Sequence, residues 1–388
     1  MAASATPFIA QRALEIDASG IRKVFDLAAK LKDPINLSIG QPDFDVPEAI
    51  KEAAIAAIRG GKNRYTPTQG IGELIAPLKQ KVAAETGWTD PAMLILSGTS
   101  SGLVLAMFAA LNPGDEVLFL DPYFVMYKHL PRLCGAVPVA VDSYPDFRLH
   151  PERIEAAITP RTKMLILCSP NNPTGMALSR EELEAAAAIA RKHHLLVISD
   201  EIYDAFSYQP HRSIAPYLPG QCILLKGYSK TYGMTGWRLG YAAATGEAAA
   251  VVEQMTKLQQ YTFVCAPSMV QYAALETISG SDHPPVDMTP FVNAYKKKRD
   301  RVVEALRADF ALNEPGGAFY AFPKVPGDGR ITATQFVQKA IDRNVLIIPG
   351  NVFSSRDTHF RLSYATSDEK LAKGLAILQE LAAEAGRL

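Results

Sequence analysis

Short apolar runs recur along the chain, and each is followed by polar or glycine residues and then by a helical pattern. Because these runs are apolar on both faces, they predict strands of a parallel sheet that helices cover on both sides. The clearest runs are MLILSG (93–98), EVLFLDP (116–122), KMLILCSP (163–170), LLVISDE (195–201) and CILLKGY (222–228). The repeated order of strand, loop and helix indicates an α/β fold with a large, doubly wound and mostly parallel sheet.

Capping residues mark the starts of several predicted helices. In each case Ser, Thr or Asp is followed three residues later by Glu, which is the pattern of a capping box. The pairs are Ser179 with Glu182, Asp45 with Glu48, and Thr366 with Glu369. Glycines are expected to end two of these helices, at Gly60 with Gly61 and at Gly386.

The order of elements predicts two domains. A large domain that contains the sheet is expected over residues 47–289, and the segment SGSDHPP (279–285) has the composition of a linker near its end. The runs GAFYAFP, NVLIIPG and HFRLSYA that follow predict a smaller α+β domain. We expect residues 1–46 to join residues 290–388 in this smaller domain.

Composition narrows the class of protein. The chain has 388 residues, of which 48% are hydrophobic and 21% charged, as is ordinary for a soluble globular enzyme. Its 40 basic and 40 acidic residues give a net charge of zero, which argues against a broad nucleic-acid or anionic-membrane surface. The N-terminal stretch lacks the pattern of a signal peptide, and no apolar run has the length of a membrane span. A cytoplasmic location is expected.

The cysteines Cys134, Cys168, Cys222 and Cys265 are widely spaced and form no CxxC pair. Cys168 and Cys222 lie inside apolar runs. They predict buried, reduced thiols rather than a disulfide framework or a zinc site, and no metal is expected.

Reactive side chains follow the apolar runs where the predicted strands end. Ligands bind at the carboxyl ends of the strands in an open parallel sheet, so these positions are the first to inspect. One strand leads into a helix through small hydroxyl residues and a glycine, where backbone N–H groups suit a phosphate. The strand ends carry Ser97, Gly98, Thr99 and Ser100; Asn172 in NNPTG; Asp200 with Tyr203; and Ser229 with Lys230. Each group alone has an ordinary structural explanation, but their convergence favours a site.

The stretch GYSKTYGMTGWRLGY (227–241) contains Lys230 and Arg238 but no acidic residue. Two cations without a counter-charge predict an anionic partner from outside the polypeptide. Pyridoxal 5′-phosphate needs a lysine for a Schiff base, a carboxylate at its pyridine nitrogen, donors to its ring oxygen and an anion pocket. Lys230, Asp200, Asn172 with Tyr203, and Arg238 supply these groups in turn.

These motifs resemble those of the class I/II aminotransferases of pyridoxal-phosphate fold type I, the aspartate aminotransferase superfamily. The similarity runs along nearly the whole chain, and the order and spacing of the motifs fit the family. The most specific motifs are SKTYGMTGWRLGY with Lys230 and Arg238, SPNNPTG with Asn172, SDEIY with Asp200 and Tyr203, and RLSYA with Arg361.

The resemblance implies further cofactor contacts. SGTSSG matches the family's phosphate loop at Thr99 and Ser100, and Ser229 is a possible further phosphate donor. In DPYFVMY, Phe124 stands where the family stacks an aromatic ring on the cofactor. In NRYTPTQG, Tyr65 stands where the family sends a tyrosine to the phosphate of the other subunit, which implies a homodimer with shared active sites.

The resemblance also implies how the substrate is held. Arg361 is expected to clamp the α-carboxylate of the amino acid, with Asn172 and the backbone of Gly40 in SIGQPDF beside it. One departure is Gly227, because many members carry a serine three positions before the lysine. The phosphate pocket is therefore expected to have one hydroxyl fewer.

The expected activity is transfer of an amino group from an L-amino acid to a 2-oxo acid, with 2-oxoglutarate as acceptor and ping-pong kinetics. Lys230 would move the proton from the substrate α-carbon, and Asp200 and Tyr203 complete the expected catalytic set. Small molecules are the expected partners, with no nucleic acid and no membrane. The amino donor stays open, because side-chain specificity comes from pocket shape.

Other functions remain as alternatives. A carbon–sulfur β-lyase of the same fold would use the same cofactor and lysine, and the motifs do not separate it from an aminotransferase. A nicotinamide-dependent oxidoreductase would need a GxGxxG turn after its first strand, which GTSSG lacks. A non-catalytic regulator of this fold would usually add a DNA-binding domain, for which the chain has no room.

Overall fold

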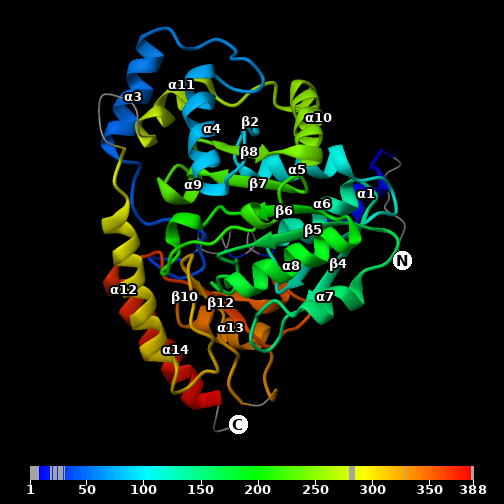
Figure 1. The fold of residues 1–388 in the computed structure, drawn as a ribbon. Helices are drawn as coiled ribbons and strands as arrows, with labels where there is room; N and C mark the ends of the chain where they lie inside the picture. Colours follow the sequence, from blue (N-terminus) through cyan, green and yellow to red (C-terminus); the bar gives the residue numbers. More distant parts are fainter. Residues whose placement is uncertain are drawn as a thin grey trace.

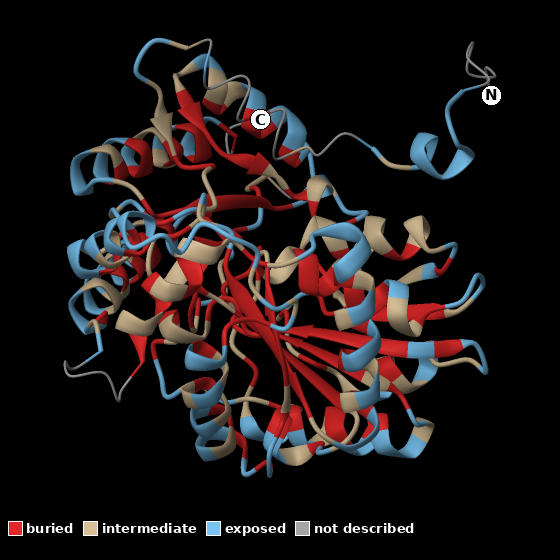
Figure 2. Ribbon diagram, turned by 90° about the horizontal axis from the view of Figure 1, so that it is seen from above, coloured by how far each residue is buried: buried red, intermediate tan, exposed pale blue. Residues whose placement is uncertain are grey.

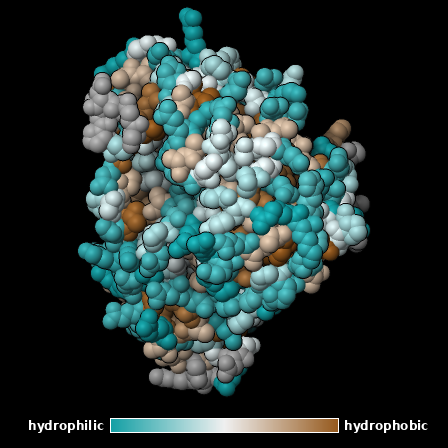
Figure 3. All heavy atoms as spheres, viewed as in Figure 1, coloured by the Kyte–Doolittle hydropathy of each residue, from teal (hydrophilic) through white to brown (hydrophobic). Residues whose placement is uncertain are grey.

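The computed structural model describes residues 8–17, 20, 24, 29, 31–278, 285–327 and 329–385. A large sheet lies in the middle of the molecule, with helices on both faces and a smaller α/β unit along one side (Figure 1). Within the described residues, no helix is both long enough and apolar enough to cross a membrane. The face drawn in Figure 3 is mostly hydrophilic, with scattered hydrophobic residues.

The large sheet has seven strands in the order β2-β8-β7-β6-β5-β3-β4. Their bounds are β2 (Ala92–Leu96), β3 (Glu116–Asp121), β4 (Val137–Asp142), β5 (Thr162–Cys168), β6 (Leu196–Asp200), β7 (Cys222–Gly227) and β8 (Gly240–Ala244). β8 runs antiparallel to both of its neighbours, and the other pairings are parallel. The predicted mostly parallel α/β sheet is confirmed, and every predicted run forms a strand.

Helices cover the sheet from both sides. They are α3 (Glu48–Arg59), α4 (Gly72–Thr86), α5 (Thr99–Ala110), α6 (Val125–Leu133), α7 (Pro151–Ala157), α8 (Arg180–His193), α9 (Tyr228–Thr231), α10 (Gly246–Thr262) and α11 (Ser268–Ala273). The short helix α1 (Gln11–Leu14) has no buried residue. Alternate strand residues pack on opposite faces: Ile166 joins a core with α5 and α10, and Leu165 joins one with α4, α8 and α11. Apart from the edge strand β4, the strands of the large sheet are therefore largely buried, and they appear red in Figure 2.

The predicted capping boxes have different outcomes. At α8, the Ser179 hydroxyl accepts from the Glu182 N–H and the Glu182 carboxylate accepts from the Ser179 N–H, as predicted. At α3, Pro47 precedes the helix, and Asp45 accepts from Val46 and pairs with Lys51 instead of capping. That prediction was wrong because proline lacks the N–H and fixes the helix start.

The C-terminal helix α14 (Asp368–Ala385) begins one residue later than the predicted cap at Thr366 requires. The Ser367 hydroxyl accepts from the Lys370 N–H, so Ser367 takes the place predicted for Thr366. At the other predicted stop, Gly60 follows the last residue of α3 as expected, whereas Gly386 lies outside the described residues.

The smaller unit contains short strands and the C-terminal helices. Its elements are α12 (Thr289–Leu306), β9 (Tyr320–Ala321), α13 (Ala333–Asp342), β10 (Val345–Leu346), β11 (Ile348–Pro349), the 3₁₀ turn η4 (Gly350–Val352), β12 (Phe360–Ser363) and α14. The other 3₁₀ turns, η1 (Asp204–Phe206), η2 (Ala215–Tyr217) and η3 (Ala274–Thr277), lie earlier in the chain. β1 (Ile35–Asn36) pairs in parallel with β10, and β11, β12 and β9 form an antiparallel sheet. The division at residues 46/47 and 289/290 stays a prediction, and 279–284 of the predicted linker lie outside the described residues.

The cysteines form no disulfide. Cys168 and Cys222 are buried, as predicted, but Cys134 and Cys265 are only half-buried. The surface helix α6 ends just before Cys134, which explains why that prediction failed for this residue.

Candidate active site

A cavity of about 420 Å³ opens at the carboxyl ends of β5, β6 and β7 and gathers almost all of the predicted site residues. Those that line it are Gly40, Thr99, Ser100, Phe124, Asn172, Asp200, Tyr203, Ser229, Lys230, Arg238 and Arg361. Tyr65 is the exception: it lies on the loop between α3 and α4 and is 84% exposed.

Asp200 is the last residue of β6 and points into the cavity. Its backbone lies between Cys168 of β5 and Leu225 of β7, so both neighbouring strands fix its position. The Tyr127 hydroxyl donates to Asp200 Oδ2 at 2.6 Å. Burial raises the pKa of Asp200 to about 6, although the Tyr127 hydrogen bond opposes this shift.

Lys230 lies in the short helix α9, directly after β7. Its Nζ donates to the carbonyl of Gly40 at 2.6 Å, and it forms no ion pair within the described residues. Burial, with the positive charges of Arg361 and Arg238 nearby, lowers the pKa of Lys230 to about 8. A substantial fraction of this amine is neutral near pH 8, which suits a nucleophile and a base.

Arg238 comes between α9 and β8 in the chain, and its guanidinium lies beside Gly98 at the N-terminus of α5. Its Nη1 donates to the carbonyl of Thr235 at 3.0 Å and its Nη2 to that of Ser97 at 3.4 Å. Gly98, at φ +80°, makes this approach possible, because a Cβ there would stand 2.6 Å from Arg238 Nη2. No side chain caps α5, so its first N–H groups, the hydroxyls of Thr99 and Ser100, and a guanidinium face the same space.

Arg361 enters the cavity from β12 of the smaller unit and is 1% exposed. Its Nη1 donates to Asn172 Oδ1 at 2.9 Å and its Nη2 to the carbonyl of Ser38 at 2.7 Å, while Nε has no hydrogen-bond partner among the described residues. The rings of Tyr320 and Phe353 lie 4.5 and 4.8 Å from the guanidinium carbon. Burial lowers the pKa of Arg361, and a buried cation without a carboxylate indicates an anionic ligand.

Sequence reasoning missed several residues that line the cavity. Tyr127 contacts Asp200, and Tyr320 places its hydroxyl 3.0 Å from that of Tyr203. Tyr127 follows Phe124 by three residues in α6, and this one-turn spacing is the signal that could have revealed it. The other missed lining residues are Ser38, Ile39, Gln41, Leu103, Val125, Cys168, Ile202 and Thr235.

Gly227 has no room for a serine side chain. A Cβ at this position would stand 2.3 Å from Ile202 Cδ1 and 3.0 Å from Thr99 Cγ2. The space that a serine would need is therefore filled by Ile202, and no empty slot replaces the missing hydroxyl.

The fold and the site define a class of protein: an α/β enzyme with a lysine, a carboxylate and two arginines at the carboxyl edge of its sheet. The family described as aminotransferase class I and II matches residues 32–378. A probable aspartate aminotransferase of Methanocaldococcus jannaschii is 37% identical over 381 residues, covering 96% of this chain and 99% of that protein. A probable N-acetyl-LL-diaminopimelate aminotransferase of Bacillus subtilis is 39% identical over 377 residues, covering 95% of this chain and 94% of that protein.

The solved structure of aspartate aminotransferase from Thermus thermophilus with maleate has a TM-score of 0.90 and 34% identity, covering 97% of this chain and 100% of that chain. The chain belongs to the class I and II aminotransferases. The predicted family, fold type and enzyme class are confirmed.

Proposed function

We propose that this aminotransferase binds pyridoxal 5′-phosphate in the cavity at the carboxyl ends of β5 to β7. The observation that carries the proposal is the charge of the lining, where Lys230, Arg238 and Arg361 face a single carboxylate, Asp200. Arg361 is buried, Lys230 is half-buried and Arg238 is exposed. An unpaired charge is costly where it is buried, so the lining suits a ligand pair that brings a carboxylate to Arg361 and a phosphate to Arg238. The family depends on this cofactor.

The cofactor's phosphate would lie at the N-terminus of α5. Arg238, the hydroxyls of Thr99, Ser100 and Ser229, and the free N–H groups of the helix are suited to hold it. Phe124 would pack on the ring. When bound, the cofactor supplies an aldehyde that takes up the amino group and a ring that delocalises the electron pair of the substrate's α-carbon.

The remaining residues would bind the substrate and move its proton. Asp200 is placed to accept a hydrogen bond from a protonated pyridine nitrogen, and Tyr203 and Asn172 to donate to the ring oxygen. Arg361 would pair with the α-carboxylate beside Gly40. The Lys230 amine, with its lowered pKa, is suited to take a proton from the α-carbon and return it.

The reaction we propose is amino transfer from an L-amino acid to a 2-oxo acid such as 2-oxoglutarate, by a ping-pong course. Incubation with amino acids and 2-oxoglutarate should give glutamate and the matching 2-oxo acid. Release of pyruvate and ammonia from cysteine conjugates without an acceptor would instead identify a carbon–sulfur β-lyase.

The proposed assembly is a homodimer in which Tyr65 reaches the partner's phosphate site. Tyr65 and Tyr261 are 84% and 87% exposed. The segments that carry them are joined by a hydrogen bond from Gln259 Nε2 to the carbonyl of Thr68. Val264, with φ +65°, is a strained and partly exposed β-branched residue close by. A patch of this kind is suited to burial against a second copy of the chain.

Mixing two inactive variants tests the shared site. Lys230→Ala and Tyr65→Ala chains that exchange subunits should form hybrids with one intact site, which restores part of the activity. No recovery in hybrids verified by mass would contradict the shared site. The cytoplasmic location and the exclusion of nucleic acid and membranes as partners stay predictions.

A further inference from the structure

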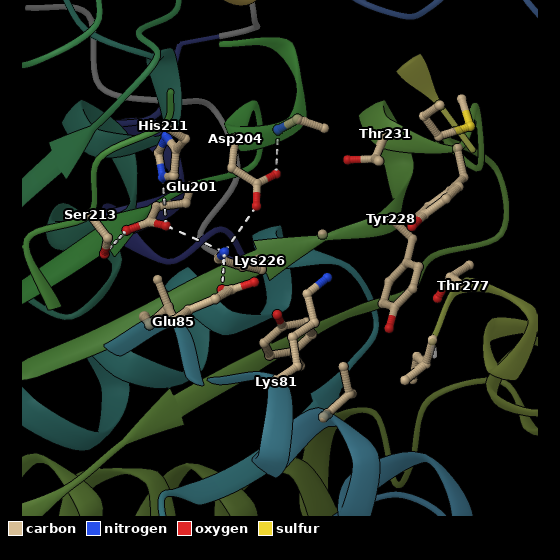
Figure 4. A pocket seen from close by; sticks show the side chains of 18 of the residues that line it. Lys81, Glu85, Glu201, Asp204, His211, Ser213, Lys226, Tyr228, Thr231 and Thr277 are labelled. Atoms are coloured by element: carbon tan, nitrogen blue, oxygen red, sulfur yellow. Dashed lines mark hydrogen bonds and ion pairs between the residues drawn. The ribbon is translucent and has the colours of Figure 1, made fainter. Parts of the chain in front are cut away.

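A second cavity, of about 770 Å³, lies on the other face of β6 and β7 and holds a buried ion cluster. We call this set the rear cluster: Glu85, Glu201, Asp204, His211, Ser213 and Lys226. Figure 4 shows the Lys226 ammonium between the carboxylates of Glu85, Glu201 and Asp204. His211 and Ser213 contact the Glu201 carboxylate in the same cavity.

Lys226 is the centre of this cluster. Its Nζ lies 2.8 Å from Glu85 Oε2, 3.0 Å from Asp204 Oδ2 and 3.8 Å from Glu201 Oε2. The lysine is 8% exposed and Glu201 is 1% exposed. The three carboxylates raise the pKa of Lys226 well above its ordinary value against the opposing effect of burial. Lys226 therefore stays charged and joins three separate elements of the chain.

Glu201 is held from several sides. Its Oε1 accepts from the Ser199 hydroxyl at 2.8 Å and from Ser213, and its Oε2 lies 2.9 Å from His211 Nε2. Burial raises the pKa of Glu201, but His211 and Lys226 lower it by more than burial raises it, so the net shift is downward. The polar atoms of Glu201 are satisfied within the cluster, so the cluster is a closed network rather than a vacant ligand site.

The rear cluster and the active site alternate along the same two segments. From the last residue of β6 onward, Asp200 and Tyr203 line the active-site cavity, while Glu201 and Asp204 belong to the rear cluster. Lys226, near the end of β7, belongs to the rear cluster, and Lys230, in α9 directly after β7, lines the cavity. No hydrogen bond or ion pair joins Asp200 to Lys230 among the described residues, so their separation depends on the backbone that carries them.

We propose that Lys226 is a positioning residue for the amino-transfer reaction. The ends of β6 and β7 are paired through their backbones as far as Glu201, whose N–H donates to the carbonyl of Leu225. By binding the Glu201 and Asp204 side chains just beyond this pairing, Lys226 holds the segment with Asp200 and Tyr203 at a fixed distance from Lys230. Glu85 extends this hold to α4. The proposal rests on the proposed function, because it concerns the alignment of Lys230 with Asp200 around the same cofactor.

The test compares variants of the full chain at saturating cofactor and well below the melting temperature. Lys226→Met keeps the length of the side chain but removes its charge, Lys226→Arg keeps the charge, and Asp204→Asn removes one carboxylate with little change in shape. Arg299→Met is the matched control, because Arg299 is a 7% exposed cation paired with Glu314 in the smaller unit, away from the cavity.

For Lys226→Met, kcat should fall roughly 10- to 100-fold, since misplacement of reacting groups from a distant change has effects of this size. The dissociation constant for pyridoxal 5′-phosphate, read from the visible absorbance of the titrated apoprotein, should rise about tenfold. KM for the amino acid should stay within about twofold, because Arg361 and Asn172 are untouched. Lys226→Arg should recover most of the loss.

Asp204→Asn separates positioning from long-range charge. If the rear cluster acted only through its electrostatic field, Lys226→Met and Asp204→Asn would change kcat in opposite directions, because one removes a positive and the other a negative charge. If it acts by positioning, both substitutions should lower kcat. Asp204→Asn also serves as the readout if Lys226→Met does not fold.

Arg299→Met should lower the melting temperature without changing kcat or cofactor affinity. If Lys226→Met and Asp204→Asn behave as this control does, the rear cluster is only structural and the proposal is overturned. A wild-type protein that takes up no pyridoxal 5′-phosphate would instead refute the proposed function, whatever the variants show.

Discussion

Lys226 and Lys230 lie four positions apart and have opposite surroundings. Lys226 is packed among carboxylates on one face of the sheet, and its pKa is raised. Lys230 lies among Arg361 and Arg238 on the other face, and its pKa is lowered to about 8. A buried cation that the protein itself neutralises contributes to structure, whereas one that the protein leaves without a counter-charge indicates a ligand.

Replacing Lys230 should give the largest effect on activity and the mildest effect on the fold. Lys230→Ala should lower the transamination rate by at least about 100-fold, because it removes both the bonding amine and the proton carrier. The melting temperature of the apoprotein should change little, since the substitution removes one hydrogen bond, to the carbonyl of Gly40, and no ion pair. Rate assays and calorimetry would check this, and retained turnover would contradict the assignment.

Arg361 is the other buried cation without a carboxylate partner. Arg361→Lys should lower kcat/KM for the amino acid by about 10- to 100-fold, because a lysine cannot make the same pair of hydrogen bonds. Cofactor affinity should stay unchanged, since the proposed phosphate site is at Arg238. Arg343→Met is the control, because the ion pairs of Arg343, one of them with Glu380, lie at the surface. Steady-state kinetics of both variants would show whether the loss is specific to Arg361.

The Tyr127 hydrogen bond to Asp200 should set the acid limit of cofactor binding. The hydrogen bond favours the ionised carboxylate, so Tyr127→Phe should raise the pKa of Asp200 above its value of about 6, by about one unit. The pKa of Asp200 in the folded apoprotein lies above its unfolded value of 3.8, so the apoprotein loses stability as the pH rises from 3.8 to about 6 and Asp200 ionises. In Tyr127→Phe this loss of stability should continue to a higher pH. Cofactor affinity and apoprotein melting measured from pH 5 to 8 would test both shifts. An unchanged profile would contradict this role of Tyr127.

Gly227 gives the smallest expected effect. Gly227→Ser should destabilise the protein by about 1–3 kcal/mol, because its Cβ meets Ile202 Cδ1. Adding Ile202→Val removes that methyl group and should recover most of the loss, as denaturant unfolding of the single and double variants would show. Equal stability of Gly227→Ser and wild type would mean that Ile202 moves at no cost.

The surroundings of Lys230 could be predicted from the sequence, whereas those of Lys226 could not. Lys230, Asp200 and Asn172 follow apolar runs directly and belong to the family's motifs, so local pattern was sufficient. Lys226 meets Glu85 and Asp204 only after folding, since no spacing along the chain links α4 to β7.

Two strands were also missed for local reasons. β8 is built from alanines, which have low strand propensity, and β4 is an edge strand with several exposed residues, so neither has the apolar pattern of a buried strand. The predicted cap at Asp45 failed because the proline that follows it decided where α3 begins.

Borohydride reduction of the protein loaded with pyridoxal 5′-phosphate, followed by peptide mass spectrometry, tests the central claim most directly. Reduction should make the bond between the cofactor and a lysine permanent. The account predicts that the peptide containing Lys230 carries the added mass and that Lys226 stays unmodified. Modification of Lys226 or of another lysine in its place, or no modification at all, would contradict it.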